Sequence, residues 1–335
     1  MMTSSAKRRA LLIIGLLVVL NAGALALHLM LGERSIPPNE IFTSLIGTGG
    51  QEYRFTIHEL RLPRVLTGML VGCGLALAGT VLQAITGNPL ASPGVIGLNS
   101  GAAAAVVAVM VLVPAFPMRM MPWVAFGGAF LAAAVIYSLS WRKGEAGSPV
   151  RMLLIGVGIS AMTGALITYL LTVGKIFRVS QASVWMAGSL YGRTWDHFWP
   201  LLPWQLILFL LVAAMSRKLD LFLLDTQSAT GLGLRVEGTR LLFILISVGL
   251  AGSAVAMAGT IGFVGLMAPH MARHLAGTRS IVRLPAAALL GSLIVVLADL
   301  VGRIAFAPYE IPAGLITAVI GVPYMIYLLL RRRAI

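Results

Sequence analysis

Long apolar segments recur along almost the whole chain, and they limit most strongly what this sequence can fold into. Each is close to the length of about 20 residues that an α-helix needs to cross the roughly 30 Å hydrocarbon core of a bilayer. Of the 335 residues, 59% are hydrophobic and only 11% are charged. A soluble protein has about a quarter of its residues charged. The composition therefore excludes an ordinary cytosolic enzyme and predicts an all-α polytopic membrane protein.

Ten segments have the apolar content expected of membrane-spanning helices, and short connections between them favour a single transmembrane domain over residues 1–335. We expect the spans near residues 10–31, 62–84, 95–113, 123–141, 152–173, 198–216, 240–260, 262–276, 284–305 and 310–330. The eighth is short and follows the seventh directly, so that 240–276 has an alternative as one long broken helix. Breaks are also expected near Asn88-Pro89, Ser92-Pro93-Gly94 and Ala268-Pro269-His270, where non-helical backbone needs protein or a water-filled cavity around it.

Basic residues gather at the ends of the apolar segments, which indicates membrane topology rather than nucleic-acid binding. With the N-terminus inside, 16 of the 25 Lys and Arg residues lie at cytoplasmic ends, in clusters such as Lys7 to Arg9 and Arg331 to Arg333. This bias fits the positive-inside rule and places both termini in the cytoplasm of a cell-membrane protein. The other nine form an outer surplus that requires an explanation.

Several kinds of chemistry have no residues to support them. The phosphate-binding pattern Gly-x-x-x-x-Gly-Lys-Ser/Thr does not occur, so any ATP that drives this chain is hydrolysed by a partner. His270 and His274 are one helical turn apart, but Arg273 beside them would repel a cation, and we expect no metal and no cofactor. Asp299 is the one clear acid inside a span, and we expect it to pair with Arg303 four residues later.

Three stretches together resemble the permease subunits of ABC importers for iron-siderophores, haem and cobalamin. They are Arg61 to Arg64 leading into Gly79 to Ala84 and Asn88 to Gly97, then Gly259 to Arg273, then Ala298 to Arg303 followed by Glu310 to Gly314 and Gly321 to Pro323. The resemblance implies the type II ABC importer permease fold with ten helices. It also implies a second permease subunit, in a homodimer or a heterodimer, two ABC ATPase subunits below and an extracytoplasmic siderophore-binding protein above.

The resemblance also implies roles at the two membrane surfaces. On the outer side, glutamates of the binding protein would dock onto Arg61, Arg64 and Arg303, because the planar guanidinium holds both oxygens of a carboxylate. The alternative is that these arginines contact lipid headgroups or internal acids. On the inner side, residues 223–235 resemble the segment that couples to the ATPase, with an acid replaced by Gln227; the expected contact residues are Asp225, Gln227, Ala229, Gly231, Leu232 and Gly233.

Two further sites follow from the same resemblance. The cytoplasmic gate would lie between the fourth and fifth spans, at Ser148, Pro149 and Val150, where a proline-stiffened apolar constriction hinders hydrated ions. The fifth span would line the pathway through Ser160, Thr163 and Thr168, although helix packing explains its small and hydroxyl residues equally well.

The resulting prediction is a permease, and not an enzyme, that passes an iron(III)-siderophore inward while a separate subunit hydrolyses ATP. Haem and cobalamin are the alternative cargoes within the family. An ion-coupled secondary carrier is the alternative from another class, but such carriers usually need several intramembrane carboxylates. A membrane scaffold without transport would have no reason to keep proline-broken segments at membrane depth.

Overall fold

The computed structural model describes residues 4–32, 34–47, 52–113, 115–140, 149–224 and 226–332. Within these ranges the secondary structure is helical, with no strand. Seven helices are long and apolar enough to cross a membrane, and two shorter apolar helices, Leu98–Leu112 and Ala313–Leu328, accompany them. This confirms the predicted all-α membrane architecture.

The ten predicted spans correspond to ten helices. They are α1 (Ser4–Met30), α3 (Leu62–Thr86), α4 (Leu98–Leu112), α5 (Met121–Ser140), α6 (Pro149–Val173), α8 (Trp195–Ala214), α11 (Val236–Ala258), α12 (Val264–Ala276), α13 (Ser280–Ile304) and α14 (Ala313–Arg332). A turn of π-helix, η1 (Thr56–Arg61), leads directly into α3. Five shorter elements were not predicted as spans: α2 (Pro38–Ile46), η2 (Met118–Met120), α7 (Ile176–Met186), α9 (Ser216–Leu221) and α10 (Thr226–Gly231).

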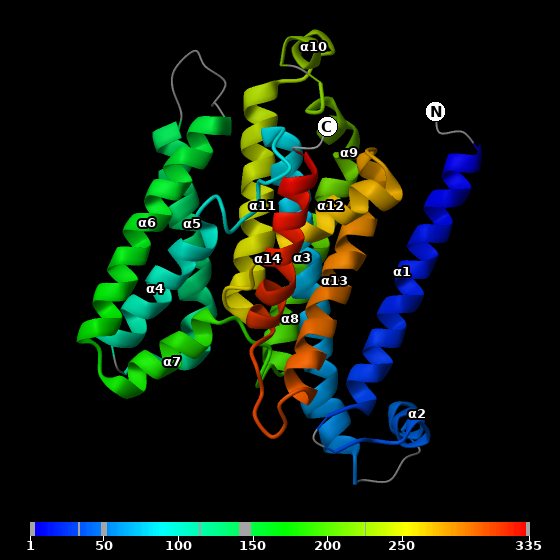
Figure 1. Ribbon diagram of the computed structural model, residues 1–335, viewed down its shortest axis with the longest axis vertical. Helices are drawn as coiled ribbons and strands as arrows, with labels where there is room; N and C mark the ends of the chain where they lie inside the picture. Colours follow the sequence, from blue (N-terminus) through cyan, green and yellow to red (C-terminus); the bar gives the residue numbers. More distant parts are fainter. Residues whose placement is uncertain are drawn as a thin grey trace.

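Helix α3 lies at the centre of the molecule, between α11 and α13 and against α12 and α8. Helix α1 packs on the far side of α13, and α4, α5 and α6 form a group beyond α11 (Figure 1). The start of α1, the end of α14 and helix α10 lie at one end of the molecule (Figure 1). Helix α2 and the connection between α13 and α14 lie at the opposite end.

Glycine allows the central helices to approach closely. A Cβ atom on Gly79 of α3 would collide with the carbonyl oxygen of Gly265 of α12, and one on Gly72 would collide with that of Gly291 of α13. No hydrophobic effect drives helices together inside lipid, so small residues that permit close backbone packing supply much of the association. These contacts fix the position of α3 and, with it, of the arginines at its start.

The breaks in the helices match the prediction in two places and differ in one. Residues 87–97 form turns between α3 and α4, as the Asn88-Pro89 and Ser92-Pro93-Gly94 patterns predict. Pro269, however, lies inside α12, so the predicted break there was wrong. Pro285 of α13 and Pro323 of α14 also lie inside helices that continue past them. The chain instead breaks just before α12, with Gly259 at φ 72° and Phe263 at φ 65°, which separates α11 from α12.

Candidate functional site

A recess of about 810 Å³ opens at the end of the molecule that carries α2. Its walls come from η1, the start of α3, the end of α13 and the segment between α7 and α8. The charged side chains that line it are five arginines and one acid, namely Arg34, Arg61, Arg64, Arg193, Arg303 and Glu310. The structure thus brings the three predicted docking arginines together and adds two more. An excess of positive charge inside a concave surface attracts anionic groups.

Arg64 is held by two carboxylates. Its Nε lies 2.8 Å from Oδ2 of Asp299 and its Nη2 lies 2.8 Å from Oδ1, so the pair is bidentate. A second ion pair joins Nη2 of Arg64 to Oε2 of Glu310 at 2.9 Å. Asp299 is only 2% exposed and also contacts Nε2 of His28 at 2.8 Å. This network joins α1, α3, α13 and the connection before α14.

Arg303 does not form the predicted ion pair with Asp299. Instead, its Nη2 donates to the carbonyl oxygens of His28, at 2.7 Å, and of Leu31. Arg61 also turns toward this place and donates to the carbonyl of Met30 at 3.2 Å. Carbonyls at the end of a helix have no partner within the helix and carry partial negative charge. Both arginines therefore cap the end of α1. The carboxylate of Asp299 is instead occupied by Arg64 and His28.

The predicted coupling segment is a short helix that projects beyond the ends of the long helices. Helix α10 and the Gly233 turn, at φ 85°, lie at the end opposite the recess (Figure 1). Ala229 is buried against Leu234 and Val236, which anchors the segment to the start of α11. Gln227, Gly231, Leu232 and Gly233 are exposed. Asp225 lies outside the described residues.

The predicted gate and pathway residues lie on α6. Ser148 falls outside the described residues, Pro149 begins the helix and Val150 is 65% exposed. The hydroxyl of Ser160 contacts that of Ser100 on α4 at 3.0 Å. Thr163 and Thr168 donate to backbone carbonyls of α6 itself, at 2.8 Å and 3.0 Å. These two hydroxyls are satisfied within the helix, so they offer oxygen acceptors rather than free donors.

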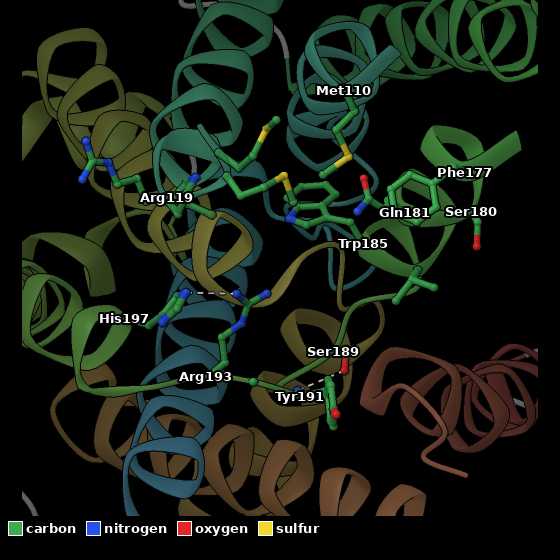
Figure 2. A pocket seen from close by; sticks show the side chains of 16 residues that line it. Met110, Arg119, Phe177, Ser180, Gln181, Trp185, Ser189, Tyr191, Arg193 and His197 are labelled. Carbon is green, nitrogen blue, oxygen red and sulfur yellow. Dashed lines mark hydrogen bonds between the residues drawn. The ribbon is translucent and has the colours of Figure 1, made fainter. Parts of the chain in front are cut away.

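A second cavity, of about 510 Å³, was not predicted from the sequence. It lies between the end of α4, the start of α5, one face of α7 and the segment that joins α7 to α8 (Figure 2). Trp185, Gln181 and Met110 line it together with Tyr191 and Arg193. Tyr191 and Arg193 also line the arginine-rich recess, so the two cavities adjoin. Arg193 is one of the nine basic residues that the sequence places on the outer side of the membrane. The cavity beside it is formed in part by α7, a helix that was not predicted.

Metal binding finds no support in the described ranges, where no three His, Cys, Asp or Glu side chains converge as a possible metal site. His270 and His274 form a pair on α12, with their Nε2 atoms 3.0 Å apart.

Comparison with known proteins identifies the family. The profile of the FecCD transport family matches residues 16–331, almost the full chain. This chain belongs to the FecCD transport family. The siderophore transport system permease protein YfhA of Bacillus subtilis is 40% identical over 336 residues, covering 98% of this chain and 97% of that protein. The Fe(3+)-citrate import system permease protein YfmE of the same organism is 40% identical over 327 residues, with coverage of 98% and 97%.

A solved structure agrees with the sequence relatives. A metal-chelate type ABC transporter in an inward-facing conformation superimposes with a TM-score of 0.84 and 28% identity, covering 95% of this chain and 99% of that chain. The predicted resemblance to ABC importer permeases, and with it the type II permease fold, is confirmed. The chain is accordingly a multi-pass membrane permease, and the ATP-hydrolysing motif that its sequence lacks belongs to other subunits of such systems.

Proposed function

We propose that this chain is the permease subunit of an ATP-driven importer that moves iron(III)-siderophore complexes across the cytoplasmic membrane. The observation that carries the proposal is the family match over residues 16–331 together with full-length relatives named for siderophore and Fe(3+)-citrate transport. Haem and cobalamin are less favoured because neither is named in these relatives. Localisation in the cytoplasmic membrane with both termini inside follows from the basic clusters at the end that carries α10.

The proposed ATPase contact is α10 with its Gly233 turn. Exposed Leu232 offers an apolar side chain to a cleft in a partner, while buried Ala229 fixes the segment to α11. A rigid, anchored projection transmits a movement of the ATPase to the long helices, whereas a loose loop would absorb it. The polar residue Gln227 on the same exposed surface would contribute a hydrogen bond instead of a charge.

The proposed docking site of the siderophore-binding protein is the arginine-rich recess. Arg61, Arg64 and Arg303 are only 6%, 8% and 8% exposed, so all three lie in the floor of the recess. Arg64 is the group best placed to bind a carboxylate of the binding protein, because its partner Glu310 lies at the surface of the recess. Docking in this form is an exchange, in which an acid of the partner takes the place of Glu310 on Arg64.

A second permease subunit is proposed to cover the apolar faces of α6 and α14. Leu154 and Val157 of α6 are 68% and 57% exposed, and Val319 and Ile320 of α14 are 71% and 56% exposed. The hydroxyls of Ser160, Thr163 and Thr168 and the apolar side chain of Val150 lie on the same helix as the first pair. A pathway between two subunits, closed at the inner end near Ser148 to Val150, is the arrangement we propose. The partner is another copy of this chain or a similar permease.

Uptake of radiolabelled iron by cells with and without the gene tests this proposal. The iron is supplied as ferric citrate, a ferric tris-catecholate, a ferric tris-hydroxamate or haem, and labelled cobalamin is the control cargo. We expect uptake of one class of iron chelate to be lost with the gene and restored by the intact copy. Unchanged uptake of all iron chelates, or loss of cobalamin uptake alone, would contradict it.

A further inference from the structure

Arg193 is a half-buried cation without a carboxylate partner. Its Nη1 contacts Nε2 of His197 at 3.1 Å, and its buried Nε has no hydrogen-bond partner. In the part of the chain that the structure describes, no carboxylate forms an ion pair with Arg193. Arginine side chains are rarely buried unless they are paired, because the loss of hydration of a charge is costly. Arg61 and Arg303 also lack a carboxylate, but they donate to the carbonyls at the end of α1, whereas Nε of Arg193 has no such acceptor.

The neighbours of Arg193 hold it in place and do not neutralise it. Nε2 of His197 lies 3.1 Å from Nη1 of Arg193, while Nδ1 of His197 accepts the backbone N–H of Thr194 at 3.3 Å and lies 3.2 Å from the Thr194 hydroxyl. Thr194 in turn caps the start of α8. Burial lowers the pKa of Arg193 to about 10, so the guanidinium is still protonated at neutral pH. A fixed positive charge thus faces the space between α7 and α8.

The space that Arg193 faces is of the right size and character for a small ligand. The cavity of about 510 Å³ falls in the range of pockets that hold ligands of drug size. Trp185, Tyr191 and Met110 offer apolar and aromatic surface, and Gln181 offers an amide (Figure 2). Through Tyr191 and Arg193 the cavity adjoins the arginine-rich recess at which the binding protein is proposed to dock.

We propose that Arg193 is the centre of an anion-binding subsite, which takes the carboxylate or catecholate oxygens of an iron(III) chelate as it leaves the binding protein. His197 is a positioning residue that aims the guanidinium. The aromatic side chains cover the organic body of the chelate. This inference rests on the proposed function and narrows it, because a site built on an unpaired cation favours anionic chelates over neutral or cationic ones.

Equilibrium binding of radiolabelled ferric citrate and of a ferric tris-catecholate to the purified importer, with its ATPase and second permease subunit, tests the subsite. In Arg193→Gln, affinity for the anionic chelates should fall about tenfold or more, the effect of losing a charge-assisted hydrogen bond. Arg193→Lys should keep more affinity than Arg193→Gln. Arg54→Gln is the matched control, because it removes an exposed positive charge near η1 and should change nothing.

Four results would overturn the proposal. They are the same affinity in Arg193→Gln as in the wild type, equal losses in the Gln and Lys variants, equal affinity of the wild type for a neutral ferric tris-hydroxamate, and no binding of either anionic chelate. A phosphate headgroup offers similar oxygens. If phosphatidylglycerol co-purifies with the wild type but not with Arg193→Gln, and no chelate binds, the site belongs to lipid and the proposal also fails.

The same variants separate this inference from the proposed function. Binding of ferric citrate that depends on Arg193, in an importer whose loss leaves cellular iron uptake unchanged, would support the subsite and contradict the transport proposal. Gene-dependent iron uptake, with the same chelate affinity in Arg193→Gln as in the wild type, would support transport and contradict the subsite.

Discussion

At the scale of single residues, the charge of Asp299 balances the buried guanidinium of Arg64. We predict that Asp299→Asn lowers the free energy of unfolding by about 3 kcal/mol, because removal of one partner leaves a buried charge that Glu310 neutralises only in part. The midpoint of thermal unfolding of the purified protein measures this effect. Glu52→Gln, at an exposed acid of the same end, is the control. An Asp299→Asn midpoint equal to that of the control would show that the network adds no stability.

Glu310 belongs to the same network but has a different expected role. If it occupies the place of a binding-protein carboxylate on Arg64, Glu310→Gln should increase the affinity of the binding protein about two- to fivefold, the range of a partly exposed ion pair. A biosensor measurement at fixed ionic strength gives this affinity. Glu59→Gln, an exposed acid of η1 that forms no ion pair with Arg64, should leave the affinity unchanged. Weaker binding in Glu310→Gln would mean that Glu310 itself contacts the partner.

At the scale of helices, the contact between α3 and α12 depends on the missing side chain of Gly79. Gly79→Ala should destabilise the protein by about 1–3 kcal/mol or prevent its assembly, because the obstacle is the backbone oxygen of Gly265 and cannot rotate away. Gly23→Ala in α1 is a matched control, since a Cβ there meets nothing within 4 Å. Yield and unfolding temperature of the two detergent-purified variants test the difference. Equal values would contradict the close-packing account.

The helices that could be predicted from the sequence are the ones whose length the bilayer dictates. Each predicted span coincides with a helix of the described residues, and seven of these helices are long and apolar enough to cross a membrane, because runs of apolar residues indicate burial in lipid. Helices α2 and α7 were missed because they are 9 and 11 residues long and do not need to cross the membrane. The break at Pro269 was wrongly predicted because a proline inside a membrane helix need not end it, as Pro203 in α8 and Pro323 in α14 also show.

Some site residues could also be predicted from the sequence, whereas their contacts could not. The family motifs contain the arginines at positions 61, 64 and 303, and the structure gathers all three at one recess. Their partners could not be predicted, because Asp299 and Glu310 are far from Arg64 in the sequence, and His28 is far from Arg303, so that these residues meet only through helix packing. The spacing of four residues favoured an ion pair between Asp299 and Arg303. Asp299 pairs with Arg64 instead, because Arg64 offers it two aligned hydrogen-bond donors. The cavity at Arg193 is lined in part by α7, and no sequence pattern predicted this helix or the cavity.

At the scale of the whole molecule, we expect the end that carries α2 to lie outside the cell membrane and the end that carries α10 to lie in the cytoplasm. We predict that a membrane-impermeant maleimide labels Arg54→Cys in intact cells, and that it labels Gly231→Cys of α10 only after the membrane is opened. Both substitutions are made in a Cys73→Ala background, which removes the one native cysteine. Labelling of Gly231→Cys in intact cells would reverse the orientation and exclude α10 as the ATPase contact.

We propose that ATP hydrolysis by a partner, and not an ion gradient, drives inward movement of an iron chelate through this chain. Proteoliposomes that contain the permease and its ATPase, with the binding protein and radiolabelled ferric citrate on one side, measure this directly. The account predicts accumulation of iron only when ATP is supplied on the ATPase side, and no effect of dissipating proton or sodium gradients. Accumulation that persists without ATP and requires such a gradient would contradict it.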